Sequence, residues 1–255
     1  MSLLDGKRGA IFGVGNENSL AWGIAQVADR AGARLALSYL NESFERRLRP
    51  LAAQLKDPLL LPCDLTDDPQ VAEFYRQLQE QWGSLDFIVH SVAFAEREDL
   101  RGSFSTTSKQ GFVTAMVGSV YTLLSAVRCG LPLLADGGSV LTLTYAGSQR
   151  VFPSYGIMGP AKAALEASVR YLAAELGGRG IRVNAISSGP VSTLSARGIH
   201  GFTDFMGAAR QRAPLGRTNT QEEVGEAALW LLSDLSRATT GHLIYVDCGD
   251  FVMGV

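Results

Sequence analysis

The chain has 255 residues, 46% of them hydrophobic and 19% charged, with a net charge of −2 and scattered Lys and Arg, which excludes a disordered chain and a nucleic-acid or anionic-membrane surface. Its three cysteines are far apart and not in metal-ligand spacing, which indicates a reducing compartment without disulfides or structural zinc. Because the chain opens with no signal-peptide pattern, and no apolar run approaches the roughly 20 residues of a membrane span, we expect a cytoplasmic protein.

Short apolar runs alternate with longer segments of helical period along the chain. Runs such as Leu59-Leu60-Leu61 and Phe87-Ile88-Val89 are apolar on both faces, which is typical of strands covered by helices on either side. The alternation predicts an α/β fold: one doubly wound, Rossmann-type domain over residues 1–255, with a seven-stranded parallel sheet between helices on both faces. Pro62 cannot donate to a β-ladder and weakens the third strand. The strands are expected at about 8–13, 34–39, 59–63, 86–91, 138–144, 181–187 and 242–247.

Capping patterns mark two helix starts. Asp67-Asp68-Pro69 places a carboxylate ahead of a proline that suits a first helical turn. Thr220 and Glu223 have capping-box spacing before an apolar stretch that ends near Leu232. Both patterns are structural signals and imply no chemistry.

Three longer segments differ from the regular alternation. The segments 108–134 and 157–176 carry more apolar residues than one buried stripe needs, so we expect helices that pair between subunits. The segment 188–214 is rich in Gly, Ser, Thr and Phe and has poor periodicity. Long irregular segments of this kind are often active-site lids, and we expect a substrate-binding lid there.

The first strand runs into a glycine-bearing turn, residues 13–23, that leads into a helix. Gly13 would let the backbone approach a pyrophosphate, and the N-terminus of the following helix would present N–H groups to it. Ser19 would add a hydroxyl hydrogen bond. Because the spacing is not GxGxxG, an ordinary tight turn with Ser19 as the helix cap remains open.

Residues at the ends of the next strands are candidates to contact the dinucleotide, because ligands of open α/β sheets lie across the carboxyl edge. Glu42 after the second strand would repel a 2′-phosphate, which favours NADH over NADPH, although Arg46 and Arg47 follow closely. The Asp64 carboxylate after the third strand would either accept a hydrogen bond from the adenine amino group or cap the next helix. His90, at the end of the fourth strand, is interpreted as an interior histidine because no second metal ligand stands at a suitable spacing.

Tyr155 and Lys162 are the most informative pair in the chain. A separation of seven residues returns to nearly the same helix face after two turns, about 10.5 Å along the axis. Pro160 is tolerated only near a helix start, so Tyr155 is expected just before a helix and Lys162 inside it. A lysine cation beside a phenol favours the phenolate, so we expect a lowered pKa for Tyr155 and a pair that stabilises an oxyanion. A half-buried aromatic and a solvated charge are the alternative.

The sixth strand ends in a turn over residues 187–193. Its backbone and the Thr193 hydroxyl would hold a carboxamide. An ordinary strand-ending turn is the alternative.

These residues resemble the short-chain dehydrogenase/reductases, and within them the bacterial NADH-dependent enoyl-acyl-carrier-protein reductases of fatty-acid synthesis. The similarity runs from Gly6 to Asp247. Ordinary members of the superfamily have the Tyr and Lys four apart, whereas a separation of seven, with Tyr145 ten residues upstream, is similar to the enoyl reductases. The other matching features are Gly13 with Ser19 and Gly23, residues 90–95 and residues 182–187.

The resemblance implies hydride transfer from NADH to the β-carbon of a trans-2-enoyl thioester on acyl carrier protein, by a homotetramer. Tyr155 would stabilise the enolate, Lys162 would bind the nicotinamide ribose, and Tyr145 would complete the catalytic set and line the acyl pocket. Cofactor contacts are implied at Gly13, Ser19, Leu20, Leu40, Asp64, Leu65, Ser91, Val92, Ala93, Lys162, Val191 and Thr193. Substrate contacts are implied at Phe94, Ala95, Tyr145, Tyr155, Met158 and Ile199.

Several positions depart from the family pattern. Leu40 stands where the NADH enzymes often carry glutamine, and Gly156 stands where asparagine is usual. Cys248-Gly249-Asp250 is unusual after the last strand. Residues 200–206 include few of the basic side chains that would meet an acidic carrier protein.

Two alternative functions remain open. A carbonyl reductase of the wider superfamily would need Thr142 in place of the usual serine donor. A non-catalytic nucleotide-binding protein would bind the cofactor without turnover, which the set of Tyr145, Tyr155 and Lys162 argues against.

Overall fold

The computed structural model describes residues 2–101, 103–152, 155–193 and 202–254. Within this part of the chain, seven parallel strands form one sheet in the order β3-β2-β1-β4-β5-β6-β7. The order reverses beside β1, as in a doubly wound sheet, so the predicted fold class is confirmed. The strands are β1 (Arg8–Phe12), β2 (Arg34–Tyr39), β3 (Leu59–Pro62), β4 (Leu85–His90), β5 (Leu134–Thr144), β6 (Arg182–Ser188) and β7 (Leu243–Val246).

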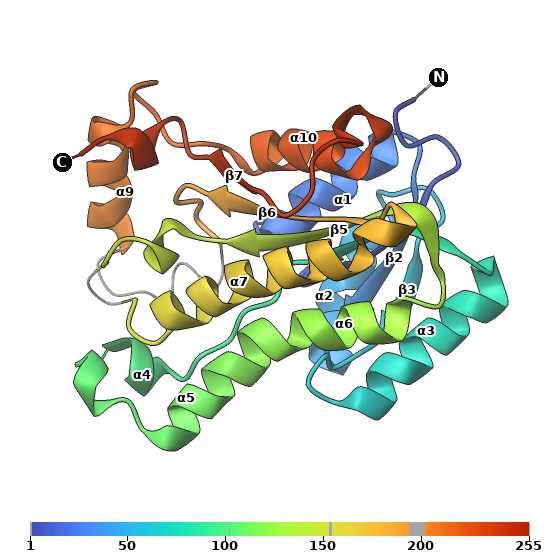
Figure 1. Ribbon diagram of the computed structural model, residues 1–255, viewed down its shortest axis with the longest axis horizontal. Helices are drawn as coiled ribbons and strands as arrows, with labels where there is room; N and C mark the ends of the chain where they lie inside the picture. Colours follow the sequence, from blue (N-terminus) through green and yellow to red (C-terminus); the bar gives the residue numbers. More distant parts are fainter. Residues whose placement is uncertain (1, 102, 153–154, 194–201, 255) are drawn as a thin grey trace.

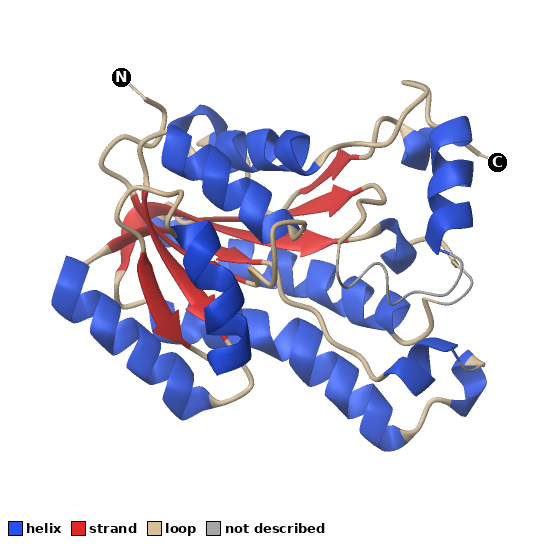
Figure 2. Cartoon of the chain, turned by 180° about the vertical axis from the view of Figure 1, so that it is seen from behind, coloured by secondary structure: helices blue, strands red, loops and turns tan. Residues whose placement is uncertain are grey.

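Alternate strand residues face opposite helical layers, because successive side chains of a strand point to opposite sides. Ala10 and Phe12 belong to one buried cluster, whereas Ile11 between them belongs to the other. Figure 1 shows the first layer in front of the sheet, and Figure 2 shows the second from behind. The first layer holds α3 (Asp68–Trp82), α6 (Thr122–Gly130) and α7 (Met158–Leu176), and the second holds α1 (Leu20–Arg30), α2 (Glu42–Ala52) and α10 (Gln221–Leu232).

Both predicted helix starts are confirmed. The Asp67 carboxylate accepts a hydrogen bond from the Gln70 backbone N–H at 3.2 Å. At α10 the capping box is complete: the Thr220 hydroxyl accepts from the Glu223 N–H at 3.1 Å, and the Glu223 carboxylate accepts from the Thr220 N–H at 2.8 Å. The helix ends at Leu232, as the apolar pattern predicts.

Two strands differ in detail from the prediction. β5 begins at Leu134 and not at 138, because Leu134 pairs with Leu85 before a register shift separates that pair from the regular ladder. β3 accommodates Pro62 because it is an edge strand and the proline is its last residue.

The expectation of an irregular segment over 188–214 is partly wrong. β6 extends to Ser188, and residues 202–212 form the helix α9 (Phe202–Arg212). Residues 194–201 lie outside the described residues. The short helix α4 (Arg97–Arg101) and five 3-10 turns complete the described elements: η1 (Phe104–Thr106), η3 (Ala146–Ser148), η4 (Gly177–Arg179), η5 (Asp234–Ser236) and η6 (Asp250–Val252).

The apolar segment that begins at 108 forms one continuous helix, Lys109–Gly130, which comprises α5 (Lys109–Met116), a π-helical turn η2 (Val117–Tyr121) and α6. The helix is 22 residues long, and its most apolar 18-residue stretch has a mean hydropathy of 1.4, enough in length and composition alone to cross a membrane. The expectation that no apolar run approaches a membrane span is therefore wrong by this measure. Half of the helix is buried inside the protein, as it would be in the core helix of a globular domain.

His90 is an interior histidine, as predicted. Its ring nitrogens share hydrogen bonds of 2.9 Å with the hydroxyls of Thr142 in β5 and Thr122 in α6. Burial, and next the charge of Lys162, lower the pKa of His90 to about 3, so the ring is neutral near pH 7. The residue therefore ties β4 to β5 and α6.

Candidate active site

Gly13 lies in the turn after β1, which packs against the chain that follows the neighbouring strand β4. Its φ is +102°, and a Cβ there would lie 2.1 Å from the backbone oxygen of Ser91. The Ser91 N–H in turn donates to the carbonyl of Phe12 at 3.1 Å. The close packing of the two strand ends therefore requires glycine, in addition to any approach of a pyrophosphate.

Replacing Gly13 by Ala is expected to destabilise the fold by about 1–3 kcal/mol, because the new methyl group meets backbone and the residue must keep a positive φ. Urea denaturation at fixed protein concentration measures this. Gly178→Ala is the matched control, since its Cβ would meet nothing within 4 Å. Equal denaturation midpoints for the two variants would contradict the packing argument.

The N-terminus of α1 lies beside this turn. Ser19 is the N-cap residue by position and Leu20 is the first helical residue. The Ser19 hydroxyl donates to the carbonyl of Asn16 at 2.6 Å instead of accepting from the helix. The interpretation of Ser19 as a side-chain cap is therefore wrong, and the first N–H groups of α1 remain suited to an anionic group.

The ends of β2 and β3 flank this turn. Leu40 is 48% exposed at the sheet edge. The Asp64 carboxylate accepts from the Thr66 N–H and hydroxyl at 2.8 and 2.7 Å, and Asp67 caps α3, so the alternative that Asp64 caps the helix is wrong. The side chain of Leu65 is buried in the core, so only its backbone is placed to contact a ligand.

The chain after β4, residues 91–95, is held by Ser119 of the π-helical turn. The Ser119 hydroxyl accepts from the Phe94 N–H at 3.0 Å and donates to the Phe94 carbonyl at 3.1 Å. The Phe94 ring is 52% exposed, and the Ser119 hydroxyl also lies 3.8 Å from the sulfur of Met158. No local sequence pattern points to Ser119, because it stands within a long apolar helix and its partner Phe94 is distant in the chain.

Tyr145 and Tyr155 meet at the end of β5. Tyr145 directly follows the strand, and its ring centre lies 5.1 Å from that of Tyr155, edge to face. Gly147 permits this packing, because a Cβ there would lie 2.5 Å from the Tyr155 ring. Tyr155 precedes α7 by three residues and Lys162 lies inside the helix, as the position of Pro160 predicts.

Lys162 is directed at the same strand end. It is 6% exposed, and its amino group donates to the carbonyl of Leu143 at 2.8 Å. Burial lowers the pKa of Lys162 to about 8, against the opposing effect of Glu166. Glu166 is 7% exposed and accepts from the hydroxyl of Thr144 at 2.7 Å.

The pKa of Tyr155 is raised, which corrects the expected lowering. Burial disfavours the phenolate more than any other influence, and the charge of Glu166 acts in the same direction. Burial also raises the pKa of Tyr145. The Tyr155 side chain is therefore a neutral phenol near pH 7, suited to donate a hydrogen bond to an oxygen that gains negative charge.

Thr142 is not placed to act as the donor of a carbonyl reductase. It is completely buried in the sheet, and its hydroxyl is shared with His90. The alternative that Thr142 replaces a catalytic serine is therefore excluded by its position.

The end of β6 completes the sheet edge. The Ser188 hydroxyl accepts from the Asn219 side-chain amide at 3.0 Å and donates to the Gly189 carbonyl at 2.8 Å. The Thr193 N–H donates to the Val191 carbonyl at 2.7 Å in the turn that follows. Ile199, an expected substrate contact, lies outside the described residues.

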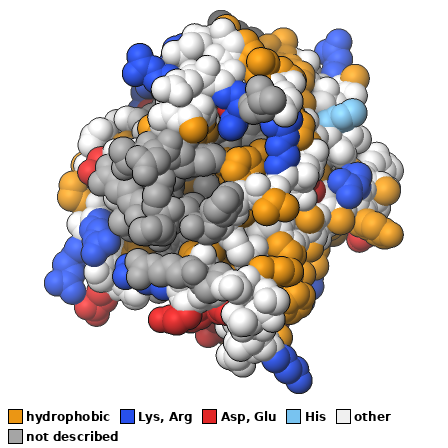
Figure 3. Space-filling model, turned by 90° about the vertical axis from the view of Figure 1, so that its left-hand side faces the viewer, with side chains coloured by type: hydrophobic (Ala, Val, Ile, Leu, Met, Phe, Trp, Pro, Cys, Tyr) orange, Lys and Arg blue, Asp and Glu red, His pale blue; other side chains and the backbone are white. Residues whose placement is uncertain are grey.

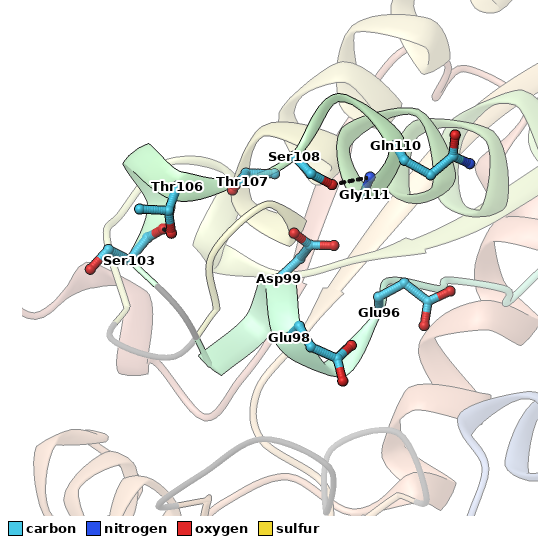
Figure 4. Close-up of a pocket in the computed structure, with 9 residues that line it drawn as sticks. All are labelled: Glu96, Glu98, Asp99, Ser103, Thr106, Thr107, Ser108, Gln110 and Gly111. Carbon is cyan, nitrogen blue, oxygen red and sulfur yellow. Dashed lines mark hydrogen bonds between the residues drawn. The ribbon is translucent and has the colours of Figure 1, made fainter.

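Gly156 has a structural reason to be glycine. Its φ is +46°, and a Cβ there would lie 2.4 Å from the Asp99 carbonyl. The short helix α4 thus packs directly against the chain that follows Tyr155. A hollow of about 400 Å³ lies beyond Asp99, and its lining includes the carboxylates of Glu96 and Glu98 (Figure 4). It contains none of the expected catalytic residues.

The structure brings together Tyr145, Tyr155 and Lys162 at the end of β5, with Met158 at the start of α7. Apart from Lys162 in α7, the expected cofactor positions follow the carboxyl ends of five parallel strands, β1, β2, β3, β4 and β6. Sequence reasoning missed Ser119, Thr144, Gly147 and Glu166, because each is defined by a contact with a residue distant in the chain.

The chain is similar to proteins of one enzyme family along its whole length. A family model described as Enoyl-(Acyl carrier protein) reductase matches residues 13–250. The enoyl-acyl-carrier-protein reductase (NADH) 2 of Rhizobium meliloti is 48% identical over 247 residues, covering 97% of this chain and 92% of that protein. The Bacillus cereus enoyl-acyl carrier protein reductase, solved with NADP⁺ and indole naphthyridinone, is 46% identical with a TM-score of 0.98, and 100% of each chain is covered. The reductase from Anaplasma phagocytophilum, solved in complex with NAD, is 47% identical with a TM-score of 0.95, covering 100% of this chain and 95% of that one.

Proposed function

The chain belongs to the enoyl-acyl-carrier-protein reductase family of the short-chain dehydrogenase/reductases, and on that basis we propose that it reduces the carbon–carbon double bond of a trans-2-enoyl thioester with NADH in fatty-acid synthesis. One observation carries the assignment: Tyr145, Tyr155 and Lys162 converge on the end of β5, in a chain that matches the family over its full length. When bound, NADH would supply the hydride, from C4 of its nicotinamide to the β-carbon of the substrate, and a proton added at the α-carbon would complete the reduction.

The residues at the sheet edge fit a dinucleotide. The turn at Gly13 and the N-terminus of α1 suit the pyrophosphate, and we assign Asp64 and Leu65, which follow β3, to the adenine. Lys162 has N–H donors beyond the one that binds Leu143, and we assign them to the nicotinamide ribose. The turn with Val191 and Thr193 suits the carboxamide.

The cofactor preference follows from the end of β2. Arg47 lies over the Phe44 ring at 5.6 Å, and Arg46 lies 3.9 Å from Glu42, so both arginines have partners on their own helix. Glu42 would repel a 2′-phosphate. These contacts support NADH over NADPH, and the ratio of kcat/KM for the two cofactors measures the preference.

In this assignment Tyr155 donates a hydrogen bond to the thioester oxygen as the enolate forms. Its raised pKa keeps the proton on the phenol, so the donor is present at neutral pH. Tyr145 packs edge-on against that ring and fixes its orientation. Phe94, Ala95 and Met158 would line the acyl chain, with Ile199.

We assign an acyl carrier protein as the source of the substrate, as the family name implies. Figure 3 shows the face at the carboxyl end of the sheet, where Lys and Arg side chains are scattered among acidic and apolar ones. Comparing kcat/KM for carrier-protein and coenzyme A thioesters of one acyl chain tests the assignment.

We also propose a homotetramer that acts in the cytoplasm. The helices α5, α6 and α7 leave large apolar side chains exposed, which suits pairing between subunits. Light scattering is expected to give a mass four times that of one chain, and a monomeric mass would exclude it. The exposed residues are Phe112 (46%), Val113 (43%), Leu124 (38%) and Tyr171 (80%).

We further propose that residues 1–255 act as one cofactor-binding and catalytic domain, with segment 188–214 as a lid over the acyl chain. The segment starts at the end of β6, beside the cofactor edge, and α9 packs near η6. Deleting the lid while keeping the fold is expected to raise KM for the thioester more than the Kd for NADH.

The function is tested by following NADH oxidation with crotonyl and acetoacetyl thioesters in parallel. Turnover of the crotonyl substrate alone is expected, because the Thr142 hydroxyl, the candidate donor of a carbonyl reductase, is buried and shared with His90. Oxidation with acetoacetyl thioester alone would establish a carbonyl reductase. NADH binding without turnover of either substrate would establish a non-catalytic protein.

A further inference from the structure

Glu166 is a buried carboxylate one helical turn after Lys162. The two side chains reach consecutive residues of β5: the Lys162 amino group donates to the Leu143 carbonyl at 2.8 Å, and Glu166 accepts from the Thr144 hydroxyl at 2.7 Å. Both are nearly inaccessible, at 6% and 7% exposure. The end of β5 therefore holds a positive and a negative side chain of α7 in fixed register.

This arrangement needs a reason, because a buried charge is unfavourable without compensation. A single hydroxyl donor offsets only part of the loss of hydration of a carboxylate. Positions four apart on a helix are neighbours on one face, about 6 Å along the axis. Lys162 and Glu166, both among the described residues, form no direct ion pair, but the charge of Glu166 acts on Lys162.

We propose that Glu166 is a positioning residue that keeps Lys162, the residue assigned to the nicotinamide ribose, in its ammonium form. The inference rests on the proposed function, since it requires Lys162 to bind the cofactor. Glu166 opposes the effect of burial on the pKa of Lys162, which stands at about 8. Without the carboxylate, a larger fraction of Lys162 would be neutral near pH 7 and unable to act as a charged donor.

The other ionisable groups around this pair are neutral near pH 7. His90 in β4 has a pKa of about 3, because burial and the charge of Lys162 disfavour its protonation. Burial and Glu166 raise the pKa of both Tyr155 and Tyr245, the latter in β7. Lys162 and Glu166 thus carry the charges within this cluster.

The test is the pH dependence of NADH binding. In the wild type, affinity should fall as the pH rises through about 8, where Lys162 loses its proton. Glu166→Gln removes the charge but keeps an oxygen that accepts from Thr144. The midpoint of the fall is expected to move down by about 1 pH unit, which raises the Kd about fivefold at pH 8 and leaves it nearly unchanged at pH 6.

Two controls separate charge from structure. Glu175→Gln, an exposed position on the same helix, should match the wild type at every pH. Thr144→Val keeps the carboxylate and removes its hydroxyl donor, so its midpoint should also stay near that of the wild type. An equal, pH-independent weakening in Glu166→Gln and Thr144→Val would show a purely structural role and overturn the proposal.

A double variant keeps the proposal testable if a single variant does not fold, because removing both buried charges together is better tolerated than removing one. Lys162→Met with Glu166→Gln is expected to bind NADH weakly, with no fall in affinity near pH 8. The wild-type pH dependence in that variant would overturn the proposal. Absence of NADH binding by the wild type at every pH would instead overturn the proposed function.

Discussion

Replacing Tyr155 by Phe is expected to lower kcat with an enoyl thioester by about 10²–10³-fold, the effect of removing one oxyanion donor. The variant keeps the ring that packs against Tyr145 and loses only the hydroxyl. Since that hydroxyl is assigned to the thioester oxygen, the Kd for NADH should change by less than about twofold. Steady-state kinetics and a fluorescence titration with NADH measure the two quantities.

Tyr171→Phe is the matched control for this change. Tyr171 lies on α7, 80% exposed in the single chain and on the face proposed to pair between subunits. The same substitution there keeps the ring and should leave both kcat and the Kd unaltered. A Tyr155→Phe enzyme with the turnover of the wild type would remove Tyr155 from the chemistry. An equal loss in both variants would indicate a general effect on the protein.

Replacing Lys162 by Met is expected to weaken NADH binding about 10–100-fold, because a charged hydrogen bond contributes about 1.5–3 kcal/mol. Turnover should fall as well, since the ribose orients the nicotinamide over the substrate. Methionine is similar in length and apolar, so it fills the buried space that Lys162 leaves. The combined loss of binding and turnover would distinguish this variant from Tyr155→Phe, which should lose turnover alone.

Lys109→Met is the control for the loss of a lysine, because Lys109 is exposed at the start of α5. Its Kd for NADH should equal that of the wild type. A Lys162→Met variant that binds NADH as tightly as the wild type would contradict the assignment of Lys162 to the ribose.

The strands were predictable because a parallel strand buried on both faces must be apolar throughout. Phe87, Ile88 and Val89 form such a run, and all three are completely buried in β4. The capping box at Thr220 was equally predictable, because its partner Glu223 lies only three residues away in the sequence. By contrast, α9 was missed because Gly207 and scattered apolar residues leave no clear helical period.

The proposed catalytic set was predictable in part. The separation of Tyr155 and Lys162 could be read on a helix, and Tyr145 was found through the family resemblance. Glu166 stands four residues after Lys162, but its role was not predictable, because its hydrogen-bond partner Thr144 lies twenty-two residues earlier in the chain. The predicted lowering of the Tyr155 pKa was wrong, because burial, which no local spacing reveals, and next the charge of Glu166 both raise that pKa.

The central claim is that Tyr155 and Lys162 act together on a bound enoyl thioester and its cofactor. A crystal structure with NAD and an unreactive acyl thioester tests it most directly. We expect the Tyr155 hydroxyl within about 2.5–3.0 Å of the thioester oxygen and the Lys162 amino group in contact with a ribose hydroxyl. A thioester oxygen bound by another group, with Lys162 away from the ribose, would contradict the claim.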